Sequence, residues 1–193
     1  MDNIYYAICS VIYMMVAKLK GVSFSLFFCC GRLSIERKKN SSITIGNKTR
    51  FMSKWWGNRL GVNHPCMLTT AKDATLTIGN KCGFTGVSIW CFKSITIGNH
   101  VRVGANCTIM DGDAHQDDPR AGANRAVIIE DNVWLGGNVV VKKGAHIGRN
   151  TVIGMNSVVT GNIPSNCIAI GNPCQVVKHF DEDKIKQIEN YFV

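Results

Sequence analysis

Aliphatic residues return at every sixth position over much of this 193-residue chain, and this pattern predicts its fold. The longest unbroken series is Ile129, Leu135, Val141, Ile147, Ile153 and Val159, and a shorter one is Ile97, Val103 and Ile109. Small or β-branched residues commonly stand four positions later, at Cys107, Val133, Val139, Ala145, Thr151 and Ser157. Short repeats of fixed period are typical of a solenoid, in which each unit packs on its neighbours. We predict an all-β solenoid shaped as a triangular prism, with one hexapeptide on each face and three in each coil.

Gly and Asn residues fit the corners of such a prism, because both tolerate the backbone conformations of tight turns. Asparagines stacked at the same corner can also form ladders between coils. The candidates are Asn47, Asn80, Asn99, Asn132, Asn138, Asn150 and Asn156. Strands of an ordinary sandwich would not hold a six-residue frame over residues 129–159, so the pattern favours the prism.

Weaker copies of the repeat at residues 43–48, 76–81 and 95–100 place the start of the solenoid near residue 41. Ile45 and Ile78 are 33 residues apart, and Ile78 and Ile97 are 19 apart. Neither spacing is a multiple of six, so we expect a loop or bulge there. The predicted solenoid domain covers residues 41–178.

Both ends of the chain are predicted to be helical. Residues 4–17 are apolar except for Ser10, a stretch shorter than the roughly 18–20 residues that span a bilayer. Apolar residues at three- and four-residue steps (Ile4, Ile8, Ile12, Met15 and Leu19) indicate an amphipathic helix. The segment 1–40 is expected to pack on the solenoid. Contact of residues 1–39 with a membrane stays open, because the apolar residues 22–30 precede three basic residues at 37–39.

At the other end, Asp181 can cap a helix in which Ile185, Ile188 and Phe192 share one face. This helix, within residues 179–193, is expected to cover the last coil, because the terminal coil of a solenoid would otherwise expose its apolar cross-section.

Composition limits the classes of partner and compartment. The chain carries nine cysteines with no secretory signal before them, and they have neither disulfide nor zinc-ligand spacing, which indicates the cytoplasm and small core residues. A formal charge of +9 favours anionic partners, such as a phosphorylated cofactor or the inner face of the membrane. The basic residues are dispersed and not interleaved with aromatic residues, so no nucleic-acid partner is expected.

The hexapeptide frame fails between Ile109 and Ile129, which are 20 residues apart where 18 would stay in phase. A polar segment at 111–126 fills this gap and carries His115. Loops on rigid scaffolds often hold catalytic residues, and a free imidazole has a pKa near neutrality, which suits a general base. Asp113 or Asp111 can orient the imidazole, although both residue types also form turns.

Three motifs on this frame resemble the galactoside and maltose O-acetyltransferases and related sugar O-acetyltransferases of capsule and lipopolysaccharide synthesis. They are Asp113-Ala114-His115, the sequence Asn-Val-Trp-Leu-Gly-Gly at 132–137, and Ile163-Pro164 leading to Gly-Asn-Pro-Cys-Gln-Val-Val at 171–177. The resemblance covers roughly residues 76–179. It implies a left-handed parallel β-helix; the period itself shows no handedness.

The resemblance also implies a reaction and a set of site residues. An acetyl group would pass directly from acetyl-CoA to a hydroxyl of a sugar or glycan, with His115 as general base and the Gly137 N–H holding the oxyanion. The pantetheine channel would be lined by Trp134, Gly136, Gly154, Met155 and Thr160, and Lys178 would approach the nucleotide phosphates. The protein would be a homotrimer with active sites between subunits, a state also favoured by the apolar residues 139–141, and the acceptor a small-molecule or lipid-linked sugar.

The chain departs from these relatives at two places. Gly161-Asn162 replaces a lysine that precedes the Ile-Pro pair, and Phe84-Thr85-Gly86 replaces an acceptor-binding asparagine. The second departure argues against galactoside or maltose and leaves Thr85 and Ser88 as candidate acceptor contacts.

Other functions stay open at this stage. They are N-acetylation of an amino sugar or xenobiotic, a non-catalytic hexapeptide scaffold, and a zinc enzyme like the γ-carbonic anhydrases. No second histidine follows His115 in the next five residues, so no metal is expected.

Overall fold

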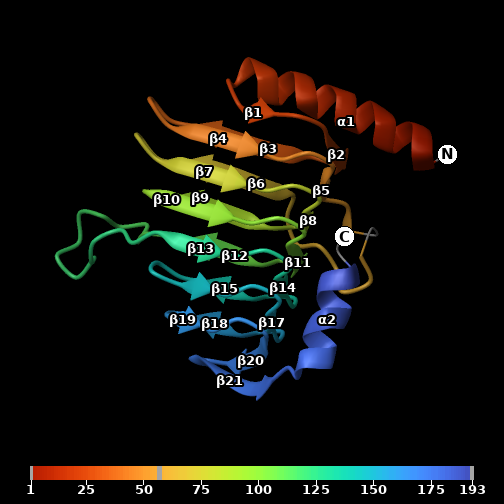
Figure 1. The fold of residues 1–193 in the computed structure, drawn as a ribbon. Coiled ribbons are helices and arrows are strands. Elements are labelled where there is room, and N and C mark those ends of the chain that lie inside the picture. Colours follow the sequence, from red (N-terminus) through yellow and green to blue (C-terminus); the bar gives the residue numbers. More distant parts are fainter. Residues whose placement is uncertain (1, 56–57, 192–193) are drawn as a thin grey trace.

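Three parallel β-sheets form a triangular prism in the computed structural model, which describes residues 2–55 and 58–191 (Figure 1). The first sheet contains β1 (Ser23–Phe24), β4 (Ser42–Ile45), β7 (Thr75–Ile78), β10 (Ser94–Ile97), β13 (Val127–Ile129), β16 (His146–Ile147) and β19 (Asn162–Ile163). The second contains β2 (Phe27–Cys30), β5 (Thr49–Met52), β8 (Gly83–Thr85), β11 (Arg102–Ala105), β14 (Trp134–Leu135), β17 (Val152–Ile153), β20 (Cys167–Gly171) and β21 (Cys174–His179). The third contains β3 (Leu33–Arg37), β6 (Cys66–Thr70), β9 (Ser88–Cys91), β12 (Thr108–Met110), β15 (Val140–Val141) and β18 (Val158–Val159).

The chain visits the first, second and third sheet in turn, so three strands complete one coil. Strands of successive coils pair in parallel, and β20 and β21 form an antiparallel hairpin at the end of the second sheet. We call the turns between sheets the 1–2, 2–3 and 3–1 corners. This arrangement confirms the predicted parallel strands on a hexapeptide repeat.

The core runs along the prism axis and consists of the predicted inward positions. Ile129, Leu135, Val141, Ile147, Ile153 and Val159 have no exposed surface. The small residues four positions later are buried as well, among them Val133, Ala145 and Ser157. Larger side chains would not fit there, because protein interiors are close-packed.

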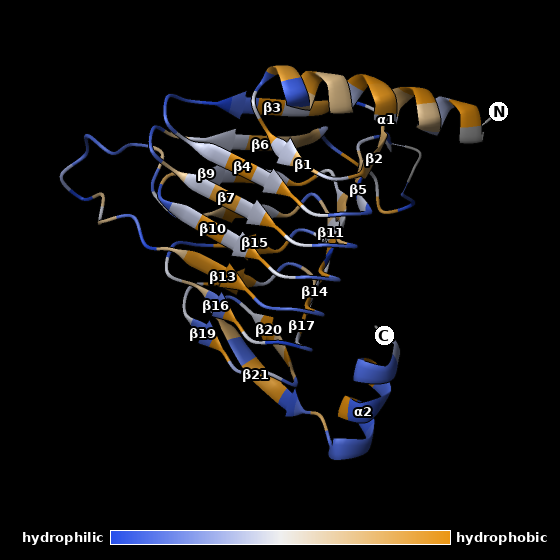
Figure 2. Cartoon of the chain, turned by 45° about the horizontal axis from the view of Figure 1, so that its top comes forward, coloured by the Kyte–Doolittle hydropathy of each residue, from blue (hydrophilic) through white to orange (hydrophobic). Residues whose placement is uncertain are grey.

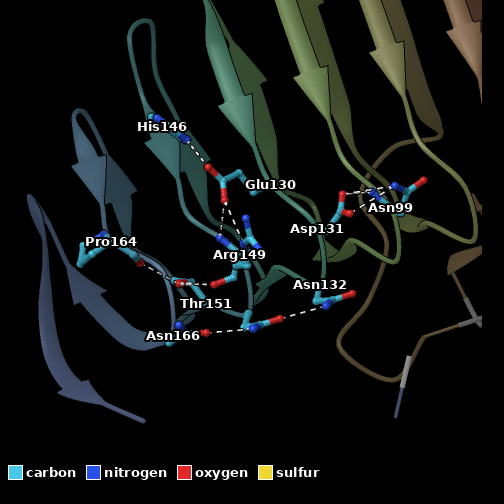
Figure 3. Close-up of polar contacts among 10 residues, drawn as sticks. Asn99, Glu130, Asp131, Asn132, His146, Arg149, Thr151, Pro164 and Asn166 are labelled. Carbon is cyan, nitrogen blue, oxygen red and sulfur yellow. Dashed lines mark hydrogen bonds and ion pairs between the residues drawn. The ribbon is translucent and has the colours of Figure 1, made fainter. Parts of the chain in front are cut away.

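The corners hold the predicted asparagine ladders. Asn132 donates to Asn150 at 2.9 Å, and Asn150 donates to Asn166 at 2.8 Å (Figure 3). All three adopt positive φ near 60°, which Asn tolerates better than most residues. In the earlier coils the left-handed residue is instead Lys48, Lys81 or His100. The side chains of Asn80 and Asn99 accept the N–H groups of Asn47 and Asn80, respectively, in the coil before.

The prism begins before residue 41, where the sequence pattern placed its start. β1, β2 and β3 pair with β4, β5 and β6 and form a complete first coil. Aromatic residues occupy inward positions here: Phe27 packs edge-on against Phe51 at 5.9 Å between ring centroids, and Phe51 stacks on Phe84 at 5.3 Å. The aliphatic pattern therefore missed this coil. Of the predicted helical and apolar segment 1–40, residues 2–19 form a helix and the apolar residues that follow enter the prism.

Two long segments leave the prism. Residues 53–65 connect β5 to β6 at the 2–3 corner, which explains most of the break in phase between Ile45 and Ile78. Residues 111–126 connect β12 to β13 at the 3–1 corner and project away from the sheets as the green loop in Figure 1.

The helix α1 (Asp2–Leu19) covers the first coil. Cys9 and Ala17 of α1 are buried, and the hydroxyl oxygen of Ser10 accepts a hydrogen bond from the Cys29 N–H at 3.0 Å. The predicted packing of an N-terminal helix on the solenoid is therefore correct. Within residues 2–55 and 58–191, no helix is both long enough and apolar enough to cross a membrane.

The helix α2 (Glu182–Tyr191) lies along the outer face of the second sheet instead of covering the last coil, as the sequence led us to expect (Figure 1). Arg102 donates to the Tyr191 hydroxyl at 3.0 Å and lies 5.2 Å from the centre of its ring. The hairpin of β20 and β21 ends the prism in place of the helix. Asp181 caps α2 as predicted, accepting from the Lys184 N–H at 2.8 Å, whereas Phe192 lies outside the described residues.

Candidate active site

A buried carboxylate fixes the start of the loop at residues 111–126. Asp111 has no exposed surface and accepts hydrogen bonds from three backbone N–H groups, those of Phe92 (2.5 Å), Lys93 (2.8 Å) and Ser94 (2.6 Å). These three residues form the 3–1 corner of the preceding coil. Of the two aspartates proposed to orient His115, Asp111 is therefore engaged in turn formation, the second role that the sequence allowed.

Asp113 ties the loop to the following coil. Its carboxylate forms an ion pair with Lys143 and accepts the Gly122 N–H at 3.2 Å. The hydrogen bond from Lys143 holds the pKa of Asp113 below its usual range. Asp113 was expected to orient His115, but in this chain Lys143 takes the carboxylate because the 3–1 corner of the next coil brings that ammonium group beneath the loop. Sequence reasoning missed Lys143, since the two residues are 30 positions apart.

His115 itself is exposed on the loop. It lines an open cleft of about 340 Å³ together with Met110, Asp113, Asp118 and Lys142. Its carbonyl accepts the Asp118 N–H at 3.3 Å, and Asp118 in turn pairs with Arg120 at 2.7 Å. The imidazole is thus presented to solvent by a loop whose two ends are held by charged groups.

Gly137 lies at the 2–3 corner and is buried. Its neighbours Gly136 and Asn138 donate their N–H groups to Ile153 (2.8 Å) and Ala105 (2.7 Å) of adjacent coils. Among the described residues nothing accepts a hydrogen bond from the Gly137 N–H. It is therefore a free donor beside the apolar tip of Met155, as an oxyanion-binding group must be.

Other predicted residues share the 2–3 corner. Thr85 ends β8 and Ser88 begins β9, so both stand at this corner two coils before Gly137. Both side chains are partly exposed. The structure thus brings the candidate acceptor contacts and the candidate oxyanion donor to one edge of the prism.

The described residues between β5 and β6, 53–55 and 58–65, cover part of this edge and were not recognised from the sequence as part of a site. Their backbone is held by Asn106, which accepts the Asn63 N–H at 2.9 Å and donates to the Gly61 carbonyl at 3.1 Å. Leu60 reaches within 3.6 Å of where a Cβ atom would stand on Gly137. The only sequence signal for this segment was the break in the six-residue frame.

Within one chain His115 and Gly137 stand at opposite edges of the third sheet. The 3–1 corner at Lys142, beside the His115 cleft, follows Gly137 by five residues, and strands rise about 3.3 Å per residue, so the sheet separates the two corners by roughly 16 Å. A base and an oxyanion donor must both lie about 3 Å from one reacting group. One chain alone does not bring them together.

The candidate cofactor residues also lie in separate places, some on the outer face of the second sheet and one at the 3–1 corner. Trp134, Val152, Ile168 and Lys178 form one outward row across the second sheet, from β14 to β21. Trp134 is 53% exposed and lines a cleft of about 450 Å³ between this sheet and α2, together with Arg102, Lys184 and Tyr191. Lys178 is exposed at the end of the row, whereas Thr160 stands at the 3–1 corner, away from the others.

Coil packing already requires glycine at two of the predicted channel positions. A Cβ atom on Gly136 would stand 2.7 Å from the Met155 nitrogen, and one on Gly154 would stand 2.5 Å from a methyl group of Ile170. These approaches are too close for a side chain to fit without a shift. The two glycines are thus explained as corners of stacked coils, with Met155 exposed beside them.

The cysteines are small core residues, as the sequence indicated. All nine are buried and unpaired. Burial raises the pKa of Cys107 to about 11 and those of Cys82 and Cys91 to about 12, so these thiols stay protonated at neutral pH. In the part of the chain that the structure describes, no group of three or more His, Cys, Asp or Glu side chains could hold a metal ion.

Comparison with known proteins defines the family. The bacterial transferase hexapeptide model (six repeats) matches residues 126–161, and the hexapeptide repeat of succinyl-transferase matches residues 94–112. The galactoside O-acetyltransferase of Lactococcus lactis subsp. lactis (strain IL1403) is 44% identical over 169 residues, which is 81% of this chain and 79% of the relative. The chain therefore belongs to the hexapeptide-repeat acetyltransferase family, and it is an enzyme that uses acetyl-CoA as acyl donor.

More distant matches agree with the fold. The putative lipopolysaccharide biosynthesis O-acetyl transferase WbbJ of Escherichia coli (strain K12) is 34% identical over 110 residues, covering 50% of this chain and 56% of the relative. The crystal structure of AntD, an N-acyltransferase from Bacillus cereus in complex with dTDP and 3-hydroxybutyryl-CoA, superposes with a TM-score of 0.70. It is 18% identical and covers 93% of this chain and 94% of its own, and at that identity the likeness concerns the fold alone.

Proposed function

We propose that this enzyme transfers the acetyl group of acetyl-CoA to a hydroxyl of a sugar or glycan. The observation that carries the proposal is the 44% identity to a galactoside O-acetyltransferase over most of both chains, together with an exposed His115 on a loop anchored at both ends. The left-handed sense of the coil and a cytoplasmic location, at the inner face of the membrane where glycan precursors are lipid-linked, belong to the same proposal.

In the proposed mechanism His115 removes the proton from the acceptor hydroxyl as its oxygen attacks the thioester carbonyl. The Gly137 N–H stabilises the negative charge that develops on the carbonyl oxygen by donating a hydrogen bond to it. This N–H is available because no group among the described residues accepts from it. The acetyl group passes directly to the acceptor, and coenzyme A leaves as the thiol after taking up a proton. Asp113 does not orient the imidazole in this scheme; with Lys143 it holds the loop in place.

The active site is proposed to lie between two copies of the chain in a homotrimer. This proposal is supported by the separation of the two corners within one chain. The loop of one copy would meet the 2–3 corner of the next, so that His115 of the first copy comes close to Gly137 of the second. Thr160, at the 3–1 corner of the first copy, would in the same way approach the candidate cofactor residues of the second. Thr85 and Ser88 stand on the same edge as Gly137 and would contact the acceptor. Light scattering should give three times the mass of one chain, and a stable, fully active monomer would contradict the shared site.

Two residues of one outward row on the second sheet are proposed to hold the donor. Trp134 presents its ring on the outer face of the second sheet and would contact the pantetheine arm with Gly136, Gly154 and Met155. Lys178, exposed at the end of the same outward row, would contact the phosphates.

An acceptor screen tests the proposal. Release of the coenzyme A thiol from acetyl-CoA should be measured with free sugars, nucleotide sugars, lipid-linked oligosaccharides and the matching amino sugars. Acetylation of hydroxyl-bearing acceptors at rates well above those of their amino counterparts is expected. N-acetylation, which the sequence leaves open, is the second candidate, and preference for the amino sugars would favour it. No turnover with any of these acceptors would contradict the proposed acceptor class.

A further inference from the structure

The helix α1 has two apolar faces, and the protein covers only one. With successive residues about 100° apart on a helix, Cys9, Tyr13 and Ala17 fall on the side that packs on the first coil. Six large apolar residues fall on the opposite side within an arc of about 100°. They are Ile4, Ile8, Val11, Ile12, Met15 and Leu19, each between 50% and 88% exposed.

This uncovered face is continuous along the helix. Figure 2 shows the hydrophobic colouring along α1, at the end of the prism opposite the hairpin of β20 and β21. With a rise of about 1.5 Å per residue, the ridge from Ile4 to Leu19 is about 23 Å long. Scattered apolar residues on a surface are ordinary, but a contiguous ridge marks a surface that binds something.

The positive charge of the protein is concentrated at the same end. Residues 2–54 contain nine Lys and Arg against two acidic residues, a balance of +7, whereas residues 55–193 contain thirteen against eleven, a balance of +2. Lys18, Lys20 and Lys39 are exposed, and Lys54 lies 3.2 Å from the centre of the Tyr5 ring at the edge of the ridge. The ridge is therefore set in a strongly basic surface.

We propose that α1 lies flat on an anionic lipid bilayer. The ridge inserts at the boundary between headgroups and acyl chains, and the surrounding lysines and arginines contact the headgroup phosphates. The helix does not meet the requirements for a membrane span, which fits an interfacial position. A second copy of the chain is disfavoured as the occupant, because pairing two ridges would bring two ends of charge +7 together.

Docking in this way sets the height of the loop above the membrane. β12, which precedes the loop, is three strands from β3 in the third sheet, and strands are about 4.8 Å apart, so the loop begins roughly 14 Å along the axis from the first coil. This step rests on the proposed function: an acceptor carried on a lipid headgroup would be held within reach of His115.

Vesicle binding by the full-length protein tests the proposal. The probe is a vesicle of phosphatidylcholine with about one third phosphatidylglycerol, compared with phosphatidylcholine alone. The parent protein should float with the anionic vesicles, and less at high salt because exposed charges are screened. Ile8→Ser with Ile12→Ser should weaken binding about 30-fold, whereas the control pair Ile128→Ser with Ile170→Ser, exposed by 39% and 46% on the sheets, should bind like the parent.

A second pair of variants tests the charge contribution. Lys18→Gln with Lys20→Gln should also weaken binding about 30-fold, since each lysine near an anionic surface contributes about a fivefold step. Lys184→Gln with Lys186→Gln, the same spacing on α2, should have no effect. Melting temperatures of all four variants should match the parent, because the substituted side chains are exposed or partly exposed outside the core.

Three results would overturn the proposal. The parent could fail to float with anionic vesicles, the α1 variants could float as well as their controls, or the Ile8 and Ile12 variant could dissociate an assembly without vesicle binding, which would identify a second copy as the occupant. Turnover of a soluble acceptor by the two α1 variants, whose substituted residues lie outside the candidate active site, should stay at the parent level. That readout separates failure of membrane docking from failure of the proposed acetyl transfer.

Discussion

Replacing Asp111 by Asn should destabilise the protein and disorganise the loop that carries His115. The carboxylate is fully buried, and one of its oxygens accepts from Lys93 and Ser94 while the other accepts from Phe92. An amide keeps one accepting oxygen, so at least one N–H loses its acceptor and faces an NH₂ group instead. Hydrogen bonds to charged groups contribute about 1.5–3 kcal/mol each, and the two that persist become neutral and weaker.

Together these losses amount to about 3 kcal/mol, or a melting temperature lower by roughly 6–12 °C for a chain of this size. The measurement is thermal unfolding followed by circular dichroism, with Asp117→Asn as the control because Asp117 is exposed on the same loop. The control should change stability by no more than about 0.5 kcal/mol. If Asp111→Asn melts with the control, the three hydrogen bonds do not hold the loop and the reasoning fails.

Three further predictions concern the donor site, the loop and the thiols. Trp134→Ala should raise KM for acetyl-CoA with little change in kcat. Lys178→Ala should also raise this KM, and more strongly at low salt than at high salt, because its contact is electrostatic. Unchanged KM values in steady-state assays would refute both placements. The hydrogen bond from Lys143 lowers the pKa of Asp113, so the pair stabilises the loop at pH values above the ordinary carboxyl pKa of about 3.9. This contribution disappears as the pH falls through the lowered pKa. Lys143→Met should raise the pKa of Asp113 in a carboxyl ¹³C titration, and an unchanged pKa would exclude the pairing. A thiol-alkylating reagent should leave all nine buried cysteines unmodified in the folded protein and acetyl transfer intact, and rapid loss of activity on alkylation would revive thiol catalysis.

The sequence predicted the middle of the prism better than its ends, for a physical reason. From residue 129 to 159 the core is made of aliphatic residues in strict register, and the pattern is directly visible. In the first coils the core positions are filled by Phe27 and Phe51, which pack as aromatic pairs, so an aliphatic period could not reveal them. The position of α2 depends on Arg102 and Tyr191, which are 89 residues apart and carry no local signal.

In the candidate site too, features with a local sequence signal could be predicted, whereas features that depend on contacts between coils could not. The break in the frame was enough to predict the loop, because a polar excursion cannot form a prism wall, and it made His115 the candidate base. The roles of Asp111 and Asp113 could not be separated, since they depend on which backbone N–H groups and which ammonium group the adjacent coils supply. The opposite placement of His115 and Gly137 became visible only when each was assigned to a corner of the prism.

The turnover of His115→Ala on the acceptor found by the screen is the most direct test of the proposed chemistry. General-base catalysis contributes roughly 10²–10⁴-fold, so kcat should fall by about that factor while the Kd for acetyl-CoA stays unchanged, because other residues hold the donor. Near-parent turnover by His115→Ala, or accumulation of an acetylated enzyme when the acceptor is absent, would contradict direct transfer with His115 as the base.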